Sequence, residues 1–111
     1  MEVMKYPSPE DPARAPVWEN YVIAQAVEAS RGHIPEHTLA YGVEVDGTRL
    51  RLRFQLSEVT ETDDEDIDDI VGDFEDLVGP DVEVDFLLEV LEWRRLSPHD
   101  GVCWVYLSRV D

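Results

Sequence analysis

Basic residues and cysteine are both scarce in this sequence. Nine lysines and arginines stand against 26 aspartates and glutamates in 111 residues, which gives a formal net charge of -17. This charge disfavours DNA, RNA and anionic membrane surfaces as direct partners, because each of them would repel the chain. The single cysteine, Cys103, excludes an internal disulfide. Its apolar surroundings, GVCWVYL, predict a buried and unreactive thiol.

Long apolar runs are missing as well. No stretch of about 18 apolar residues occurs, so the sequence predicts no transmembrane helix. Residues 1–16 lack the apolar core that is typical of a signal peptide, so a cytoplasmic location is expected. The same residues hold four of the seven prolines, which predicts an extended or flexible N-terminal arm over 1–16. The remainder, 17–111, is apolar enough to form a single domain with its own core.

Two segments with regularly spaced apolar residues follow the arm. Residues 18–31 carry a helical stripe of Trp18, Tyr21, Val22, Ala26 and Ala29, widened by Ile23 and Val27. Residues 39–56 alternate between apolar and polar side chains on both sides of Asp46-Gly47. This pattern predicts a hairpin with a two-residue turn at Asp46-Gly47, in which Val43 faces Leu50, Tyr41 faces Leu52 and Leu39 faces Phe54.

The second half of the chain predicts another helix and two more strands. The strands are expected over 82–93 and 101–110. We therefore predict an α+β fold of order α-β-β-α-β-β, with a four-stranded, mainly antiparallel sheet and both helices on one face. The later strands have apolar residues on both faces. Either these strands are central in the sheet, or the outer sheet face carries an apolar patch around Leu87, Leu91 and Trp93. A homodimer through the sheet stays open on the same ground.

The negative charge is concentrated in one segment, Glu58 to Asp85. This segment has 14 acids and no lysine or arginine, whereas the rest of the chain has 12 acids and nine bases. Its apolar residues recur at helical spacing and are Ile67, Ile70, Val71, Phe74, Leu77 and Val78. The spacing predicts an amphipathic helix over 63–78, begun by a capping box of Thr62 and Glu65 and ended by Gly79.

The face opposite this apolar stripe is a candidate partner-binding surface. Its residues are Glu65, Asp66, Asp68, Asp69, Gly72, Asp73 and Asp76. Like charges four residues apart destabilise a helix by about 0.2–0.5 kcal/mol per pair, and a glycine in the helix interior costs about 1 kcal/mol relative to alanine. A surface selected for stability alone would not combine these features, which favours binding of a basic partner over a merely solvated face.

Catalytic and metal-binding patterns are weak. The window from Asp64 to Glu75 partly matches a calcium-binding EF-hand loop, but Asp69 replaces the required glycine and the helical period runs through it. Weak, diffuse cation binding by these carboxylates stays open. The three histidines, His33, His37 and His99, lack metal-ligand spacing. We therefore expect no enzyme, no cofactor and no metal, and we expect the three arginines of the hairpin to pair with sheet acids, namely Arg49, Arg51 and Arg53 with Glu44, Glu83 or Asp85.

In size, placement of acidic charge and mixture of helices and strands, the chain resembles the small acidic immunity proteins that neutralise bacterial toxins. The resemblance implies that the acidic helix occludes a basic toxin domain, for example a nuclease. Two other interpretations remain. One is a structural or adaptor subunit that associates through the apolar outer sheet face. The other is a small enzyme or ligand binder built around Cys103, Trp104 and the histidines.

Overall fold

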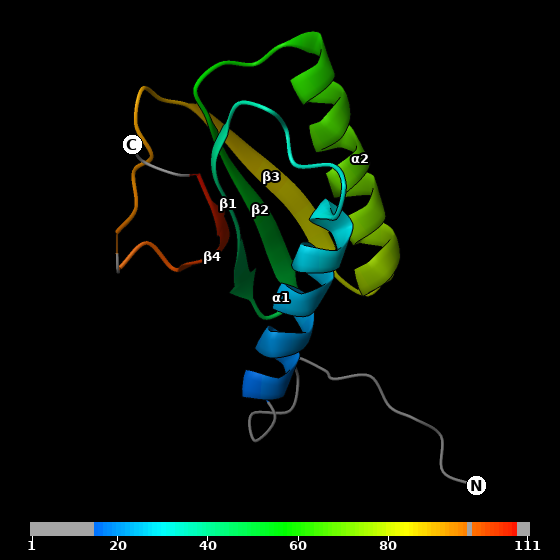
Figure 1. Cartoon of the computed structure of the whole chain (residues 1–111). Coiled ribbons are helices and arrows are strands. Elements are labelled where there is room, and N and C mark those ends of the chain that lie inside the picture. Colours follow the sequence, from blue (N-terminus) through cyan, green and yellow to red (C-terminus); the bar gives the residue numbers. More distant parts are fainter. Residues whose placement is uncertain (1–14, 98, 109–111) are drawn as a thin grey trace, which may run out of the picture.

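In the computed structural model, the described residues, 15–97 and 99–108, form a sheet of four strands and two helices that cover one of its faces (Figure 1). The elements are α1 (Ala15–Ser30), β1 (Thr38–Asp46), β2 (Arg49–Leu56), α2 (Glu61–Val78), β3 (Glu83–Val90) and β4 (Val102–Leu107). The predicted α+β class and element order are confirmed. The predicted arm at 1–16 lies outside the described residues, apart from its last two, which begin α1.

The strand order in the sheet is β3-β2-β1-β4. β1 pairs antiparallel with both β2 and β4, as the mainly antiparallel prediction requires. β2 and β3, in contrast, are parallel. Parallel neighbours need a crossover connection, and α2 supplies it. The acidic helix is therefore held at both ends by strands of the same sheet.

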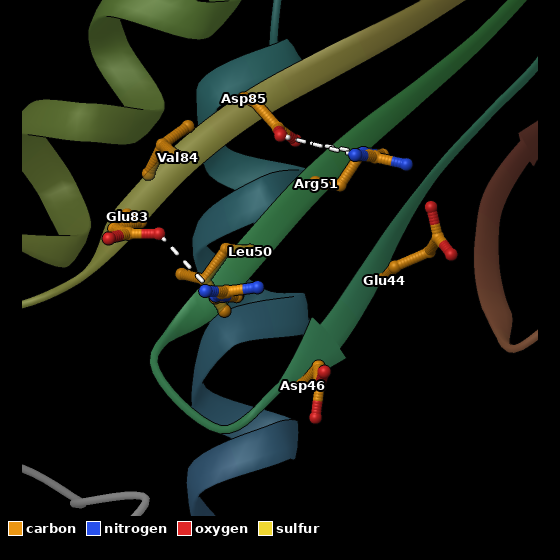
Figure 2. A pocket seen from close by; sticks show the side chains of 8 residues that line it. Glu44, Asp46, Leu50, Arg51, Glu83, Val84 and Asp85 are labelled. Carbon is orange, nitrogen blue, oxygen red and sulfur yellow. Dashed lines mark hydrogen bonds and ion pairs between the residues drawn. The ribbon is translucent and has the colours of Figure 1, made fainter.

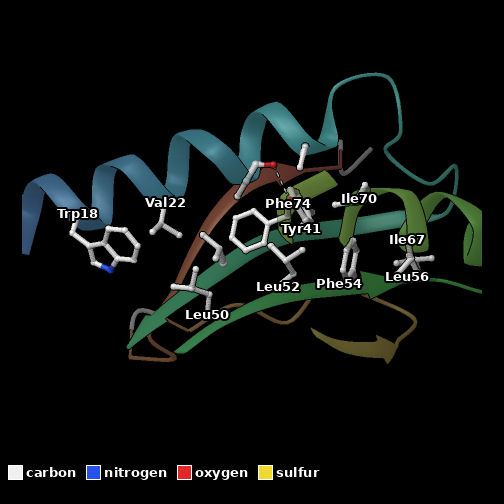
Figure 3. Packing of buried hydrophobic residues seen from close by; sticks show 13 residues of the cluster. Trp18, Val22, Tyr41, Leu50, Leu52, Phe54, Leu56, Ile67, Ile70 and Phe74 are labelled. Atoms are coloured by element: carbon white, nitrogen blue, oxygen red, sulfur yellow. Dashed lines mark hydrogen bonds between the residues drawn. The ribbon is translucent and has the colours of Figure 1, made fainter. Parts of the chain in front are cut away.

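The core lies between the two helices and the sheet (Figure 3). Alternate residues of the hairpin point into it, namely Tyr41, Val43, Leu50, Leu52, Phe54 and Leu56. The helices contribute Trp18, Val22, Ala26 and Ala29 from α1 and Ile67, Ile70 and Phe74 from α2. The buried Tyr41 hydroxyl donates to the Ala26 carbonyl at 2.8 Å, so this polar group is satisfied inside the apolar core.

The hairpin turns one residue later than predicted. Asp46 pairs with Arg49, so the two-residue turn is Gly47-Thr48, and Val43 faces Leu52. Gly47 has a φ of 60°, which suits the first central position of a tight hairpin turn. The predicted register was therefore wrong by two residues. Because a shift of two leaves every side chain on its original face, the predicted core face is still correct.

α2 begins two residues before its predicted start. Its N-cap is Thr60, whose Oγ1 accepts from the Asp63 backbone N–H at 3.1 Å. The Asp63 carboxylate accepts in turn from the Thr60 N–H at 2.9 Å. The predicted capping box of Thr62 and Glu65 is wrong. Thr60 and the buried Asp63 form the box instead.

Other predicted boundaries also move. α1 starts at Ala15 rather than Trp18, and Val27 is 44% exposed instead of widening the buried stripe. β3 ends at Val90, before the predicted end at Trp93, and β4 ends at Leu107. The last predicted residues of that final strand, 109 and 110, lie outside the described residues. Neither α1 nor α2, the helices of the described part, is long and apolar enough to cross a membrane.

Candidate functional site

α2 presents its acids to solvent because its other face is fixed in the core. Ile67, Ile70 and Phe74 are buried beneath it. All seven predicted site residues lie outside this buried face, and all but the half-buried Asp66 are exposed. We call this set the acidic ridge, made of Glu65, Asp66, Asp68, Asp69, Gly72, Asp73 and Asp76. The fold thus places on one helix surface the residues that the sequence grouped together.

The acidic ridge is not neutralised from within the described chain. Across residues 15–97 and 99–108, none of its acids forms an ion pair with a lysine or arginine. The one ion-pair contact of the ridge in these ranges joins Nε2 of His33 to Oδ2 of Asp73 at 3.9 Å. A single imidazole can offset at most one of the ridge acids, so the ridge keeps a strong negative potential.

The arginines of β2 bind acids of the sheet instead. Arg51 Nε donates to Asp85 at 2.9 Å (Figure 2), and Arg49 Nε lies 3.5 Å from Glu83. The hydrogen bond from Arg51 holds the pKa of Asp85 below its ordinary value. These pairs confirm the predicted cross-strand pairing. They also line a hollow of about 390 Å³ on the sheet, together with the further acids Glu44 and Asp46.

Arg53 is the most enclosed of the three hairpin arginines. Its Nη2 donates to Glu89 at 2.7 Å and its Nη1 to Glu44 at 3.3 Å. Its guanidinium carbon lies 6.0 Å from the centre of the Trp104 ring, a cation–π distance. The contacts of Arg53 therefore lie on the outer sheet face, and Arg53 forms no ion pair with the acidic ridge.

Gly72 sits within the acidic ridge without a steric reason inside the described chain. A Cβ atom built at this position would meet no atom within 4 Å. Its φ is not positive either, so the backbone does not require glycine. The missing side chain opens the surface of the ridge, and the helix bears the cost in propensity.

The loop after α1 brings a histidine to the ridge that the sequence did not connect with it. One ligand atom each from His33, Asp66 and Asp69 lies within 4.8 Å of the other two. An imidazole with two carboxylates is a donor set that could hold a divalent cation such as Zn²⁺. The spacing from 33 to 66 gave no signal of this, because only the packing of α1 beside α2 creates the proximity. The cation binding that the sequence left open would be centred here.

A second histidine ties the same region together. His37 Nδ1 lies 2.7 Å from Oδ2 of Asp63, and His37 Nε2 lies 2.9 Å from Oε1 of Glu58. The hydrogen bond to Asp63 raises the pKa of His37 above its ordinary 6.5. Burial would raise the pKa of Asp63, but hydrogen bonds from Thr60 and His37 outweigh it and hold this pKa below 3.8. The contact fastens the segment before β1 to the first turn of α2.

The apolar groups proposed for the outer sheet face are only partly together. Leu87 is 40% exposed and Trp93 is 75% exposed, whereas Leu91 is half-buried. Leu87 lies on β3, the edge strand, and Leu91 and Trp93 follow the end of that strand. Ion pairs occupy much of the remaining outer face. Cys103 is half-buried, and burial raises the pKa of its thiol, which keeps it in the less reactive protonated form.

Comparisons with known proteins give no relative from which a function could be transferred. The chain matches no protein-family model, no curated protein and no solved structure. Its function therefore has to be inferred from its own geometry. The most distinctive part of that geometry is the exposed, unneutralised acidic ridge on α2.

Proposed function

We propose that this is a non-catalytic binding protein whose acidic ridge occupies a basic surface on a partner protein. One observation carries the proposal: the hairpin arginines are bound to sheet acids, while the ridge acids have no arginine or lysine partner in the described chain. A fold that can pair charges on its sheet leaves them unpaired on α2. Such a surface attracts an oppositely charged partner.

The electrostatics of the ridge suit rapid and specific association. Complementary charge patches raise association rate constants toward about 10⁸–10⁹ M⁻¹ s⁻¹ at low salt. Gly72 lets a partner surface approach the helix backbone closely. The capping box and the His37–Asp63 contact hold the helix in place, so little ordering is needed on binding.

Within this class we propose an immunity protein that neutralises a basic toxin domain. Nuclease active sites are basic because they bind phosphate backbones, so an acidic ridge can occupy such a site in place of the nucleic acid. The ridge would then inhibit by occlusion and would need no chemistry of its own. The high negative charge suits this mode, since the protein competes with a polyanion.

An adaptor role is the second candidate. It is favoured by Trp93, which is 75% exposed, together with the exposed Leu87. Large exposed apolar groups are typical of association surfaces. Salt discriminates the two roles, because apolar association depends weakly on ionic strength and ridge binding depends on it strongly.

The test starts from capture of partners from native lysate at low salt, followed by purification of the captured protein. We expect the double variant Asp69→Lys/Asp73→Lys to bind it at least about 100-fold more weakly, a loss of roughly 2.7 kcal/mol. The matched control is Asp46→Lys/Glu92→Lys, which makes the same charge change at exposed acids away from α2. Equal affinity of the ridge variant and the wild type would refute the proposal.

The immunity role has a separate readout. One equivalent of the wild-type protein should abolish the activity of the purified partner and protect cells that express it. The ridge variant should lose both effects, while the control variant keeps them. If the protein binds the partner but leaves its activity intact, the proposed acidic binding surface stands and the immunity role is excluded. Loss of binding in Trp93→Ala, with little salt dependence, would identify the adaptor role.

A further inference from the structure

β3 is a terminal strand of the sheet, and its outer edge pairs with no other described strand. The Glu83 N–H donates to the Thr48 carbonyl, and the Leu91 N–H donates to the Leu56 carbonyl. Between them the parallel register with β2 is regular. The N–H and C=O of one residue point to the same side of a strand, and this side alternates from residue to residue, so the odd-numbered residues bond to β2. The N–H and C=O groups of the even-numbered residues point to the open edge, and these residues are Val84, Phe86, Leu88 and Val90.

The same strand exposes an apolar row on its helix-covered side. Phe86 is 44% exposed and Val90 is 59% exposed, although both lie on the core face of the sheet. The Phe86 ring packs edge-on against buried Phe54 with ring centres 6.2 Å apart, so its position is fixed. Such an open edge with large apolar side chains is a template for another strand, and native proteins usually cover or blunt it.

The opposite side of β3 is acidic. Glu83, Asp85 and Glu89 alternate with the apolar row and face away from the helices, where each is ion-paired with an arginine of β2. A hollow of about 430 Å³ lies where α2 ends and β3 begins, lined by Glu75, Asp76, Gly79, Pro80, Val82 and Val84. Neither Glu75 nor Asp76 has an ion-pair partner in the described chain. A complementary strand would therefore be apolar toward the helices and basic elsewhere.

We propose that the open edge of β3 binds an extended segment of the partner protein in which apolar and basic residues alternate. The segment adds a fifth strand by bonding to the outward N–H and C=O groups of these four β3 residues, beside α2 (Figure 1). Its apolar side chains cover Phe86 and Val90. Its cations are attracted chiefly by Glu75 and Asp76 at the hollow, because the β3 acids already bind β2 arginines. This inference rests on the proposed function, since it assumes the same basic partner.

A second copy of the chain is a poorer occupant. Antiparallel pairing of two β3 strands centred on Phe86 would set Glu83 of one copy opposite Glu89 of the other, a destabilising like-charge pair. The α2 helices also lie toward the β3 side of the sheet, so dimerisation would bring two acidic helices together (Figure 1). A basic segment brings no second set of acids to this edge.

The test uses the full-length protein and a nine-residue peptide of alternating valine and lysine. Amide hydrogen exchange is measured by NMR with and without the peptide. We expect at least about tenfold slower exchange at Val84, Phe86, Leu88 and Val90, and a smaller effect at Leu87, whose N–H already bonds to β2. A valine–glutamate peptide, and the lysine peptide with a central proline, should bind at least about tenfold more weakly.

Val90→Lys should weaken binding of the lysine peptide by about tenfold or more, because it places a cation on the apolar row. Val27→Lys is the matched control: the same substitution at a residue of α1 that is 44% exposed, and it should bind like the wild type. Absent protection along β3, or equal effects of the two substitutions, overturns the inference.

Two further outcomes separate this inference from the proposed function. If the peptide perturbs only the acidic ridge, strand addition is overturned while the proposed function stands. If the peptide-free protein is a dimer by light scattering and Val90→Lys makes it monomeric, the occupant is a second copy and the inference is overturned.

Discussion

The Nδ1 atom of His37 lies 2.7 Å from the Oδ2 atom of Asp63, and this contact joins the entry of β1 to the first turn of α2. Because Asp63 also accepts from the Thr60 N–H, one buried carboxylate both caps the acidic helix and holds the neighbouring loop. The contact is therefore expected to control how stability depends on pH.

Stability should fall as the pH rises above about 6.5. The pKa of His37 is raised in the folded protein, so the native state binds the proton more tightly than the unfolded chain. The stabilisation is complete below about pH 6.5 and is lost as the pH rises through the raised pKa. Urea unfolding across this range should show the decline in wild type but not in His37→Gln. His99→Gln, which alters an exposed histidine, should follow the wild type; the same flattening in both variants would contradict the assignment.

At acidic pH the opposite dependence is expected from Asp63. Its pKa is lowered in the folded protein, so its stabilisation is complete above about pH 4 and is lost as the pH falls through the lowered value. Asp63→Asn should be less stable than wild type near neutrality, and the difference should shrink at low pH. Asp64→Asn, an exposed neighbour in the same turn, serves as the control. An undiminished difference at low pH would show that the Asp63 charge is not responsible.

Asp69→Lys should stabilise the folded protein at low salt. The substitution converts two repulsive pairs, with Glu65 and Asp73, into attractive ones and should raise the free energy of unfolding by about 1 kcal/mol. The gain should shrink as salt screens the charges. Asp69→Asn should give about half the effect. Unfolding curves at low and high salt measure both, and a loss of stability would mean that the ridge acids are compensated after all.

Gly72→Ala should also stabilise the protein, by up to about 1 kcal/mol, because a helix interior favours alanine and the new methyl group meets no described atom. If the ridge binds its partner closely, the same variant should bind it more weakly. Thermal unfolding and affinity measurements then move in opposite directions. A variant that gains stability and keeps full affinity would show that Gly72 is not part of the contact.

Gly42→Ala should have the opposite effect on stability. A Cβ at Gly42 would lie 2.6 Å from the Cys103 carbonyl oxygen and 2.8 Å from Cγ1 of Val102, where β1 meets β4. We expect a loss of about 1–3 kcal/mol in the free energy of unfolding, with faster amide exchange in β4. Gly72→Ala is a useful comparison, because the new methyl group meets no described atom there, although helix propensity also favours alanine at that site. Equal stabilities would contradict the close packing of these strands.

The sequence was sufficient to predict the buried face of the acidic helix and of the hairpin. Periodicity placed Ile67, Ile70 and Phe74 in the core and the ridge acids outside, because a helix has only one way to bury such a stripe. The hairpin faces were predicted for the same reason, even though the turn residues were wrong. Patterns of this kind are local, and local physics is enough to determine them.

Contacts between segments that are distant in the sequence could not be predicted from it. Nothing in the spacing of apolar residues distinguishes a parallel β3 from an antiparallel one, because both bury the same face. The approach of His33 to Asp66 and Asp69 arises only when α1 packs beside α2. The capping acid was missed for a related reason. Thr62 and Glu65 fit the local motif as well as Thr60 and Asp63 do, and burial beside His37 decides between them.

The parallel pairing of β2 and β3 also bears on the order of folding. The β1–β2 hairpin closes through a two-residue turn. β3, in contrast, pairs with β2 across the long connection that contains α2. Loop-closure entropy makes the first event fast and the second slow. The edge strand is therefore a late addition to the nucleus that the hairpin provides. A ligand that binds β3 would act on this late step and would slow the unfolding rate of the protein more than it speeds its folding.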